Sequence, residues 1–136
     1  MASQVATVGT TVVSFLEEVA DALDNSVGLV VELGTTANES SVKVASVGDN
    51  DNAIGVVVGK LQQTTGKKEA VSVALIDCGG IARVKAGGAI NKGAGVAVSG
   101  AVAGEVVTAA RASADSIGIA LEAAADGDLF NVILSR

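Results

Sequence analysis

The chain has 136 residues and a mass of 13.2 kDa, and 49% of its residues are hydrophobic while only 1% are aromatic. It contains no His, Trp, Tyr or Pro, two Phe and one Cys. Without His there is no Ser-His-Asp triad, Cys-His dyad or histidine-ligated metal, and two Phe make no platform for stacking nucleobases. These counts predict a structural protein that is not an enzyme and needs no metal or cofactor.

The formal net charge of −6 arises entirely in the first third of the chain. Residues 1–42 carry six acidic residues and no Lys or Arg, and the acids and bases of the rest cancel. This balance argues against binding nucleic acid or an anionic membrane, because both require a basic patch. The acidic third either aids solubility or meets a basic partner surface.

Hydropathy raises the question of a membrane segment, because its mean is +0.54. The longest uncharged stretch, residues 1–16, is too short and too polar to span a bilayer and lacks the basic start of a signal peptide. We therefore expect a soluble protein made in the cytoplasm. Its apolar residues are mostly Ala and Val, and because so thin a core is often completed by subunit contacts, we also expect an oligomer.

The N-terminal unit is expected to cover residues 1–27. Residues 1–13 are small, polar and β-capable, which predicts an arm or a first strand. Ser14 and Glu17 form a capping box, and apolar residues follow at helical spacing, so a short acidic amphipathic helix is predicted over residues 14–24. The residues of this unit that are candidates for contact with a partner protein or with another subunit are Val5, Val8, Val12, Phe15, Leu16, Val19 and Leu23.

From residue 28 to residue 136 the apolar period changes to two, which predicts a mainly β body, a small antiparallel barrel or sandwich. The lone Cys78 is expected to be a buried small hydrophobe. The predicted strands are residues 28–33, 41–47, 53–61, 69–77, 80–86, 95–99, 105–110, 117–122 and 129–134.

A weak internal repeat relates residues 30–58 to residues 96–121. Both contain an Ile-Gly pair, Ile54-Gly55 and Ile117-Gly118, in the third of three short strands. Either the chain is duplicated, or a sequence rich in Ala, Val and Gly repeats by chance.

Short motifs elsewhere in the chain do not complete a known site. Gly66-Lys67-Lys68 lacks the other residues of a phosphate-binding loop, and residues 93–95 lack the third Gly of a dinucleotide fingerprint. Residues 49–52 are rich in Asp and Asn, but residue 53 is Ala where a calcium loop needs an oxygen ligand. All three are predicted to be turns.

The second half of the chain resembles a family of small tailed-phage virion proteins, the capsid decoration or cement proteins. The resemblance lies in Gly-Ile-Ala-Leu-Glu-Ala-Ala followed by Gly-Asp-Leu and Val-Ile-Leu within residues 118–134, and in Gly-Gly-Ile-Ala-Arg-Val at residues 79–84. With Ala-Ile-Gly-Val-Val-Val at residues 53–58 it covers residues 28–135, whereas residues 1–27 depart from the family pattern.

The resemblance implies a β-barrel-like protein that binds the outside of an icosahedral phage capsid as a homotrimer and stabilises the shell. Its partner is then the major capsid protein, and its location is the exterior of the virion. Residues 1–13 are predicted to add a strand to a capsid sheet. The alternative function is a receptor- or glycan-binding module on the virion or tail, which the scarcity of aromatic residues disfavours.

Overall fold

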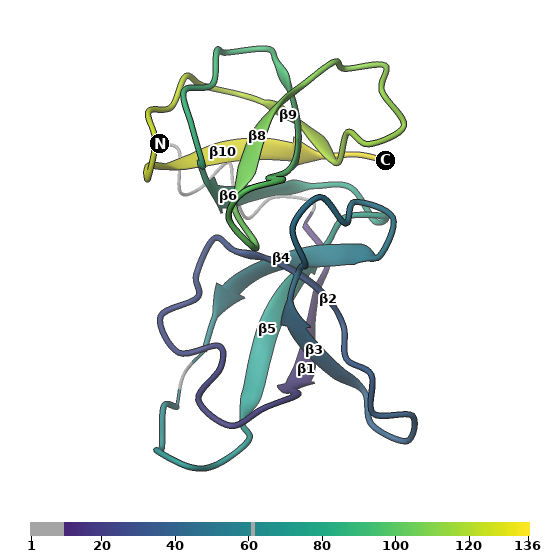
Figure 1. Ribbon diagram of the computed structural model, residues 1–136, viewed down its shortest axis with the longest axis vertical. Helices are drawn as coiled ribbons and strands as arrows, with labels where there is room; N and C mark the ends of the chain where they lie inside the picture. The colour runs from purple at the N-terminus through teal and green to yellow at the C-terminus, as the bar shows by residue number, and fades with distance from the viewer. Residues whose placement is uncertain (1–9, 61) are drawn as a thin grey trace.

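The computed structural model describes residues 10–60 and 62–136, which form ten strands in two lobes stacked along the long axis of the molecule (Figure 1). The first lobe holds β1 to β5 and the second holds β6 to β10. The strands are β1 (Val12–Glu17), β2 (Val30–Leu33), β3 (Ser41–Val44), β4 (Ala53–Gly59), β5 (Ala70–Leu75), β6 (Ile81–Lys85), β7 (Gly95–Val98), β8 (Val106–Ala109), β9 (Gly118–Ala120) and β10 (Leu129–Leu134).

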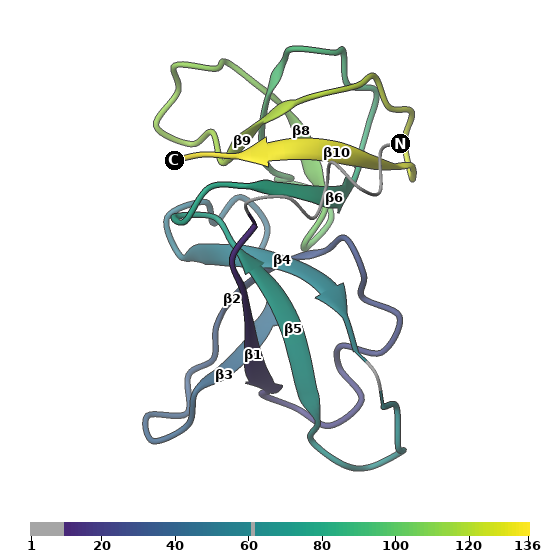
Figure 2. The ribbon, with the colours of Figure 1, turned by 180° about the vertical axis from the view of Figure 1, so that it is seen from behind.

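The first lobe is a closed barrel with the strand order β1-β3-β2-β4-β5. Strand β1 closes it, because it pairs antiparallel with β5 and parallel with β3 (Figure 2). Closure leaves no unpaired edge, which suits a chain without Pro to protect one. The β-branched side chains on the inner faces fill the barrel, whose fully buried residues are Leu23, Val31, Val42, Val57, Val71 and Val73.

The second lobe repeats this connectivity. Its order is β6-β10-β9-β7-β8, so in each lobe the first strand pairs with the fifth, the fifth with the fourth, the fourth with the second and the second with the third. The parallel β1–β3 ladder has a counterpart in the parallel bridge between Ala86 and Val106. Glu17 is the residue of the first lobe that corresponds to Ala86, because it pairs with Val42 of β3 as Ala86 pairs with Val106 of β8.

The register shows that the weak repeat in the sequence is a structural repeat. Gly55 of β4 pairs with β2 and with Leu75 of β5, while Gly118 of β9 pairs with β7 and with Leu134 of β10. The two glycines therefore occupy equivalent positions, and in both a Cβ atom would collide with the backbone and a Val side chain of the neighbouring strand. Glycine is required there because the strands approach closely.

Replacing Gly118 by alanine is expected to destabilise the protein by about 1–3 kcal/mol, the usual cost of overpacking. The added Cβ would lie 2.5 Å from the carbonyl oxygen of Ile133 and 2.5 Å from Cγ1 of Val132, and a paired strand cannot easily withdraw. Denaturant unfolding measures the change. Gly100→Ala is the matched control, because nothing lies within 4 Å of its Cβ position, and equal midpoints for the two variants would contradict the prediction.

A shared core joins the lobes. Val30, Val56 and Ala74 of the first lobe and Val84, Val98 and Phe130 of the second belong to one buried cluster. Hydrogen bonds cross the boundary as well: Val30 N–H donates to Gly104 O at 2.8 Å, and Lys85 N–H donates to Gly28 O at 2.9 Å. The lobes therefore pack as one unit around a continuous Val/Ala core.

The predicted helix over residues 14–24 is wrong. Residues 12–17 form β1, residues 18–25 form turns, and no helix occurs in the part of the chain that the structure describes. Asp21 and Asn25 have φ values of 66° and 55°, which a right-handed helix does not contain. Five residue pairs with β5 stabilise β1 as a strand, and this tertiary pairing outweighs the local capping signal.

The mainly β class is confirmed, and each of the nine predicted strands overlaps one of β2 to β10. The predicted antiparallel arrangement holds except at the β1–β3 ladder and the Ala86–Val106 bridge, which are parallel. Cys78 is exposed in the β5–β6 turn and not buried as predicted. Within the described residues no helix is long and apolar enough to cross a membrane.

Candidate functional site: the outer face of strands β1 and β5

The outer face of β1 and β5 presents small side chains at its centre and the larger Val12 and Leu16 beside them. Phe15, Val71 and Val73 point into the barrel, so the alternating residues point outward. Ser14 pairs with Ser72 and Leu16 pairs with Ala70 across the two strands. We call the surface formed by Val12, Ser14, Leu16, Ala70 and Ser72 the β1–β5 face.

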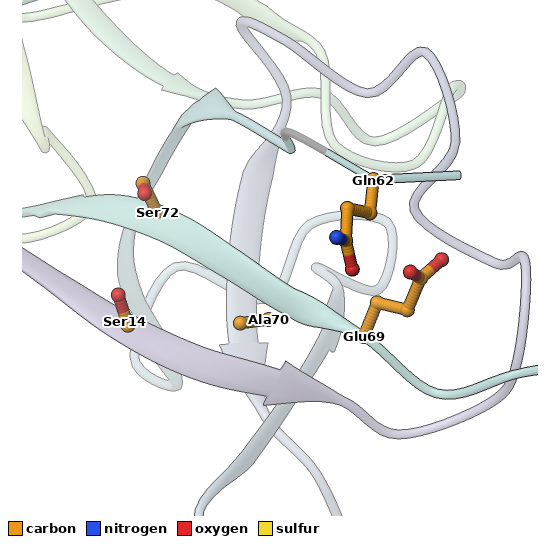
Figure 3. A pocket seen from close by; sticks show the side chains of 5 residues that line it. All are labelled: Ser14, Gln62, Glu69, Ala70 and Ser72. Carbon is orange, nitrogen blue, oxygen red and sulfur yellow. The ribbon is translucent and has the colours of Figure 1, made fainter. Parts of the chain in front are cut away.

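A hollow with a cavity volume of about 240 Å³ lies on this face, lined by Ser14, Gln62, Glu69, Ala70 and Ser72. Gln62 and Glu69 extend toward each other at one side of it, and the two serines lie on the neighbouring strands (Figure 3). The Glu69 carboxylate accepts a hydrogen bond of 2.6 Å from Thr64 N–H. The hollow is smaller than the roughly 300–1,000 Å³ of small-molecule sites.

Behind this face, three charged residues close the end of the first barrel: Glu17, Asp24 and Lys60, which we call the charged plug. Lys60 Nζ lies 2.9 and 2.8 Å from the two carboxylate oxygens of Glu17 and 2.5 Å from Oδ1 of Asp24. The side chains of Lys60 and Glu17 are 3% and 0% exposed. Two buried charges are tolerated in this place because each is paired.

The charged plug also holds the backbone around it. The Glu17 carboxylate accepts hydrogen bonds from the N–H groups of Asp21, Leu23 and Glu69, at 3.3, 3.2 and 3.1 Å. The first two bonds fix the turns of residues 18–25 across the barrel end, with the Leu23 side chain in the core. The third fixes the start of β5, whose Glu69 lines the hollow. The geometry of the β1–β5 face therefore depends on the charged plug.

Glu17 and Lys60 have shifted pKa values because of the hydrogen bonds they make in the plug. Burial alone would raise the pKa of Glu17, but hydrogen bonds from Lys60 and from the N–H groups of Leu23 and Glu69 outweigh it, and the pKa is lowered from 4.5. Burial alone would lower the pKa of Lys60, but its hydrogen bonds to Asp24 and Glu17 raise that pKa above 10.5. Both groups are therefore held in their charged forms.

Stability is expected to fall in acid because of Glu17. Its folded-state pKa is below the unfolded value, so its contribution is complete above pH 4.5 and is lost as the pH falls through the lowered pKa. The contribution of Lys60 is complete below pH 10.5 and is lost as the pH rises through its raised pKa. Urea unfolding from about pH 2 to 7 should show a steeper acid loss for the wild type than for Glu17→Gln; parallel curves would contradict this.

The structure places the contact residues predicted from the sequence in different parts of the fold. Val5 and Val8 lie outside the described residues, as does most of the predicted arm. Val12 and Leu16 belong to the β1–β5 face, and Val12 is 50% exposed. The remaining three follow strand and turn geometry instead of one helix face: Phe15 packs against the core of the first barrel, Leu23 is buried in it, and Val19 is 60% exposed in the turns.

Sequence reasoning missed the charged plug. Its one local signal was Lys60, a cation at the end of the apolar stretch of residues 53–59, where a partner of opposite charge is required if the lysine is buried. Its partners are 36 and 43 residues away, so spacing does not identify them. In the described part of the chain, no group of three or more His, Cys, Asp or Glu side chains is placed to hold a metal ion.

Neither a protein-family model nor a curated protein matches the sequence. Among solved structures, the fold is similar to the crystal structure of the head fiber gp8.5 N base of bacteriophage phi29, with a TM-score of 0.64 and 19% identity. The match covers 93% of this chain and 96% of the phage chain, so both lobes take part in it. The two-lobed β fold of this chain is thus one that a phage head fiber base also has.

Proposed function

We propose that the protein is a structural component of a phage virion that binds the outer surface of an icosahedral capsid as a homotrimer and stabilises the shell. The likeness over nearly the whole chain to the head fiber N base of bacteriophage phi29 carries this proposal. The resemblance of residues 118–134 to capsid decoration proteins supports it independently, because it rests on an ordered string of residues and not on the fold.

The β1–β5 face is the surface we assign to the capsid. Its serine and alanine side chains allow another backbone or a protruding side chain to approach closely, and its hollow gives such a side chain a place. Because each trimer would present three copies of the face, modest contacts would add up. A protein that binds the assembled shell but not free capsid subunits shifts the equilibrium toward the shell by mass action.

The structure gives little support to the alternative function, a glycan-binding module. Sugar sites use exposed aromatic faces, and Phe15 and Phe130 are the only aromatic residues of the chain. Phe130 is 1% exposed in the shared core, and Phe15 packs against the core of the first barrel. Phe130 is therefore closed to stacking, and Phe15 turns its ring toward the barrel interior and is only partly exposed.

Co-sedimentation with capsids tests the proposal. The purified protein, of three times the chain mass of 13.2 kDa by light scattering, is expected to sediment with empty expanded capsids of the phage that encodes it and to saturate. Bound capsids should also withstand higher temperature or lower salt than bare ones. A monomeric mass would overturn the trimer, and a protein that stays in the supernatant would overturn capsid binding.

Deleting residues 2–9 is expected to weaken capsid binding without unfolding the protein. The segment includes Val5 and Val8, and a short β-capable segment can add a strand to a capsid sheet. The deletion must stop there, because Val12 begins β1 and the Thr10 hydroxyl exchanges hydrogen bonds with the backbone of Ile81. Co-sedimentation of the truncated chain at wild-type affinity, with an unchanged thermal midpoint, would show that the arm does not contribute.

A further inference from the structure

A second hollow, with a cavity volume of about 120 Å³, lies in the second lobe and is lined almost entirely by hydrogen-bond donors. Among the described residues that line it there is no Asp or Glu side chain. They are Arg111, Ser113, Ser116, Ile119, Ser135 and Arg136.

Arg136 is held rigidly at this hollow. Its Nη1 donates to the carbonyl oxygens of Asn50 and Ala53 at 2.8 and 2.7 Å, and its Nε and Nη2 lie 3.1 and 3.0 Å from the Asp77 carboxylate. A guanidinium has five N–H groups, so these four bonds leave one on Nη2. The Asp77 side chain is 67% exposed, and water therefore weakens the charge that it offers to Arg136.

Arg111 is exposed and makes no hydrogen bond or ion pair with the described residues, so its N–H donors are available to a ligand. Its position is nevertheless defined by the fold, because its backbone crosses β7 at Gly95. A Cβ at Gly95 would lie 3.0 Å from the N and Cα atoms of Arg111. Glycine at residue 95 thus permits the close crossing that places Arg111 over the sheet.

The serine hydroxyls add neutral donors. The Ser113 hydroxyl oxygen accepts from Asp115 N–H at 3.1 Å, which leaves its own hydrogen free to donate. The Ser135 hydroxyl makes no hydrogen bond with the described residues. Ser116 is committed, since its hydroxyl donates to Gly118 O at 3.1 Å. One face of the hollow is the partly buried side chain of Ile119.

We propose that this hollow binds an oxyanion, a carboxylate or a phosphate group, through Arg111, the free N–H of Arg136 and the hydroxyls of Ser113 and Ser135. Its volume of about 120 Å³ is well below the roughly 300–1,000 Å³ of small-molecule sites, so it suits a single oxyanion group. Arg111 supplies the paired donors that fit two oxygens of one anion. If the proposed function holds, the source of the carboxylate is an acidic side chain of the capsid.

The test uses the full chain and two arms. In the first, inorganic phosphate is titrated at constant ionic strength while the amide signals of Ser113, Ser116 and Ser135 are followed by NMR. In the second, capsid co-sedimentation is measured. Each arm compares the wild type with three variants. Arg111→Ala removes the guanidinium, and Arg111→Lys keeps the charge but not the paired planar donors. Lys67→Ala is the control, because it removes an exposed charge from the first lobe.

Saturable phosphate shifts that weaken roughly fivefold or more in Arg111→Ala, and less in Arg111→Lys, would support the site whatever the capsid arm shows. A similar loss of capsid affinity in Arg111→Ala alone would support it with a protein carboxylate as the source. The proposal is overturned if phosphate shifts are linear and equal in all variants while Arg111→Ala sediments like Lys67→Ala. If the wild type does not bind capsids, the proposed function is contradicted, and the phosphate titration alone then decides whether the oxyanion site exists.

Discussion

Replacing Glu17 by alanine is expected to lower the free energy of unfolding by about 3–5 kcal/mol, the usual cost of removing one partner from a buried ion pair. Lys60, 3% exposed, would keep only Asp24. Three backbone N–H groups, those of Asp21, Leu23 and Glu69, would lose their acceptor as well. The turns of residues 18–25 would keep the buried Leu23 side chain, the Lys60–Asp24 contact and the bond from Gly66 N–H to the Asp21 carboxylate. Guanidinium unfolding followed by circular dichroism measures the loss.

Two further variants distinguish loss of the charge pair from loss of a side chain in general. Glu18→Ala removes the adjacent carboxylate, which accepts hydrogen bonds from Thr35 at the surface, and its effect should be clearly smaller. Glu17→Met combined with Lys60→Met removes both charges of the pair but leaves the same three N–H groups without an acceptor. It should therefore recover only the part of the lost stability that comes from the unpaired charge of Lys60. If the double variant were as unstable as Glu17→Ala, the unpaired charge of Lys60 would not contribute to the loss.

Some strand positions were predictable from the sequence because valines alternate with small or polar residues in strands that bury one face, whereas β4 and β7 are short apolar runs bounded by turn residues. The alternation of Val71 and Val73 with Ser72 identified β5, and residues 129–134 were predicted with the bounds that β10 has. The N-terminal segment failed for a physical reason. Phe15 and Leu23 both contribute to the core of the first barrel, one from a strand and one from a turn, and their spacing coincides with that of a helix.

The repeat could be detected from the sequence only at positions where close packing allows a single residue type. Gly55 and Gly118 persist in both halves because a side chain at either position would strike the adjacent strand. The remaining positions are not under this constraint and differ between the lobes. Glu17 of the charged plug corresponds to Ala86, and in the second lobe Ile90 and Ala124 are joined by two backbone hydrogen bonds, both 2.9 Å long. Contacts between residues dozens of positions apart cannot be recognised from the local spacing of residues in the sequence.

The candidate site was predictable in part. Val12 and Leu16 were selected for being apolar near the N-terminus, and they do lie on the β1–β5 face, but their neighbours there come from β5. Pairing of β1 with β5 brings Ser14 beside Ser72, which are 58 positions apart in the chain. The sheet register, which no local motif encodes, therefore creates the surface that we assign to the capsid.

Replacing Ser72 by glutamate is expected to weaken capsid binding by about a hundredfold, because a charge buried without a partner at an interface costs about 3 kcal/mol or more. Ser72 lines the hollow of the β1–β5 face, so a longer charged side chain would also fill the space that a capsid side chain needs. The fold should tolerate it, since the position points away from the core of the first barrel. Ala123→Glu, at an exposed position of the second lobe, adds the same charge elsewhere and should bind capsids like the wild type. Equal co-sedimentation of both variants at matched thermal stability would move the capsid contact to another surface; selective loss in Ser72→Glu would assign it to the β1–β5 face.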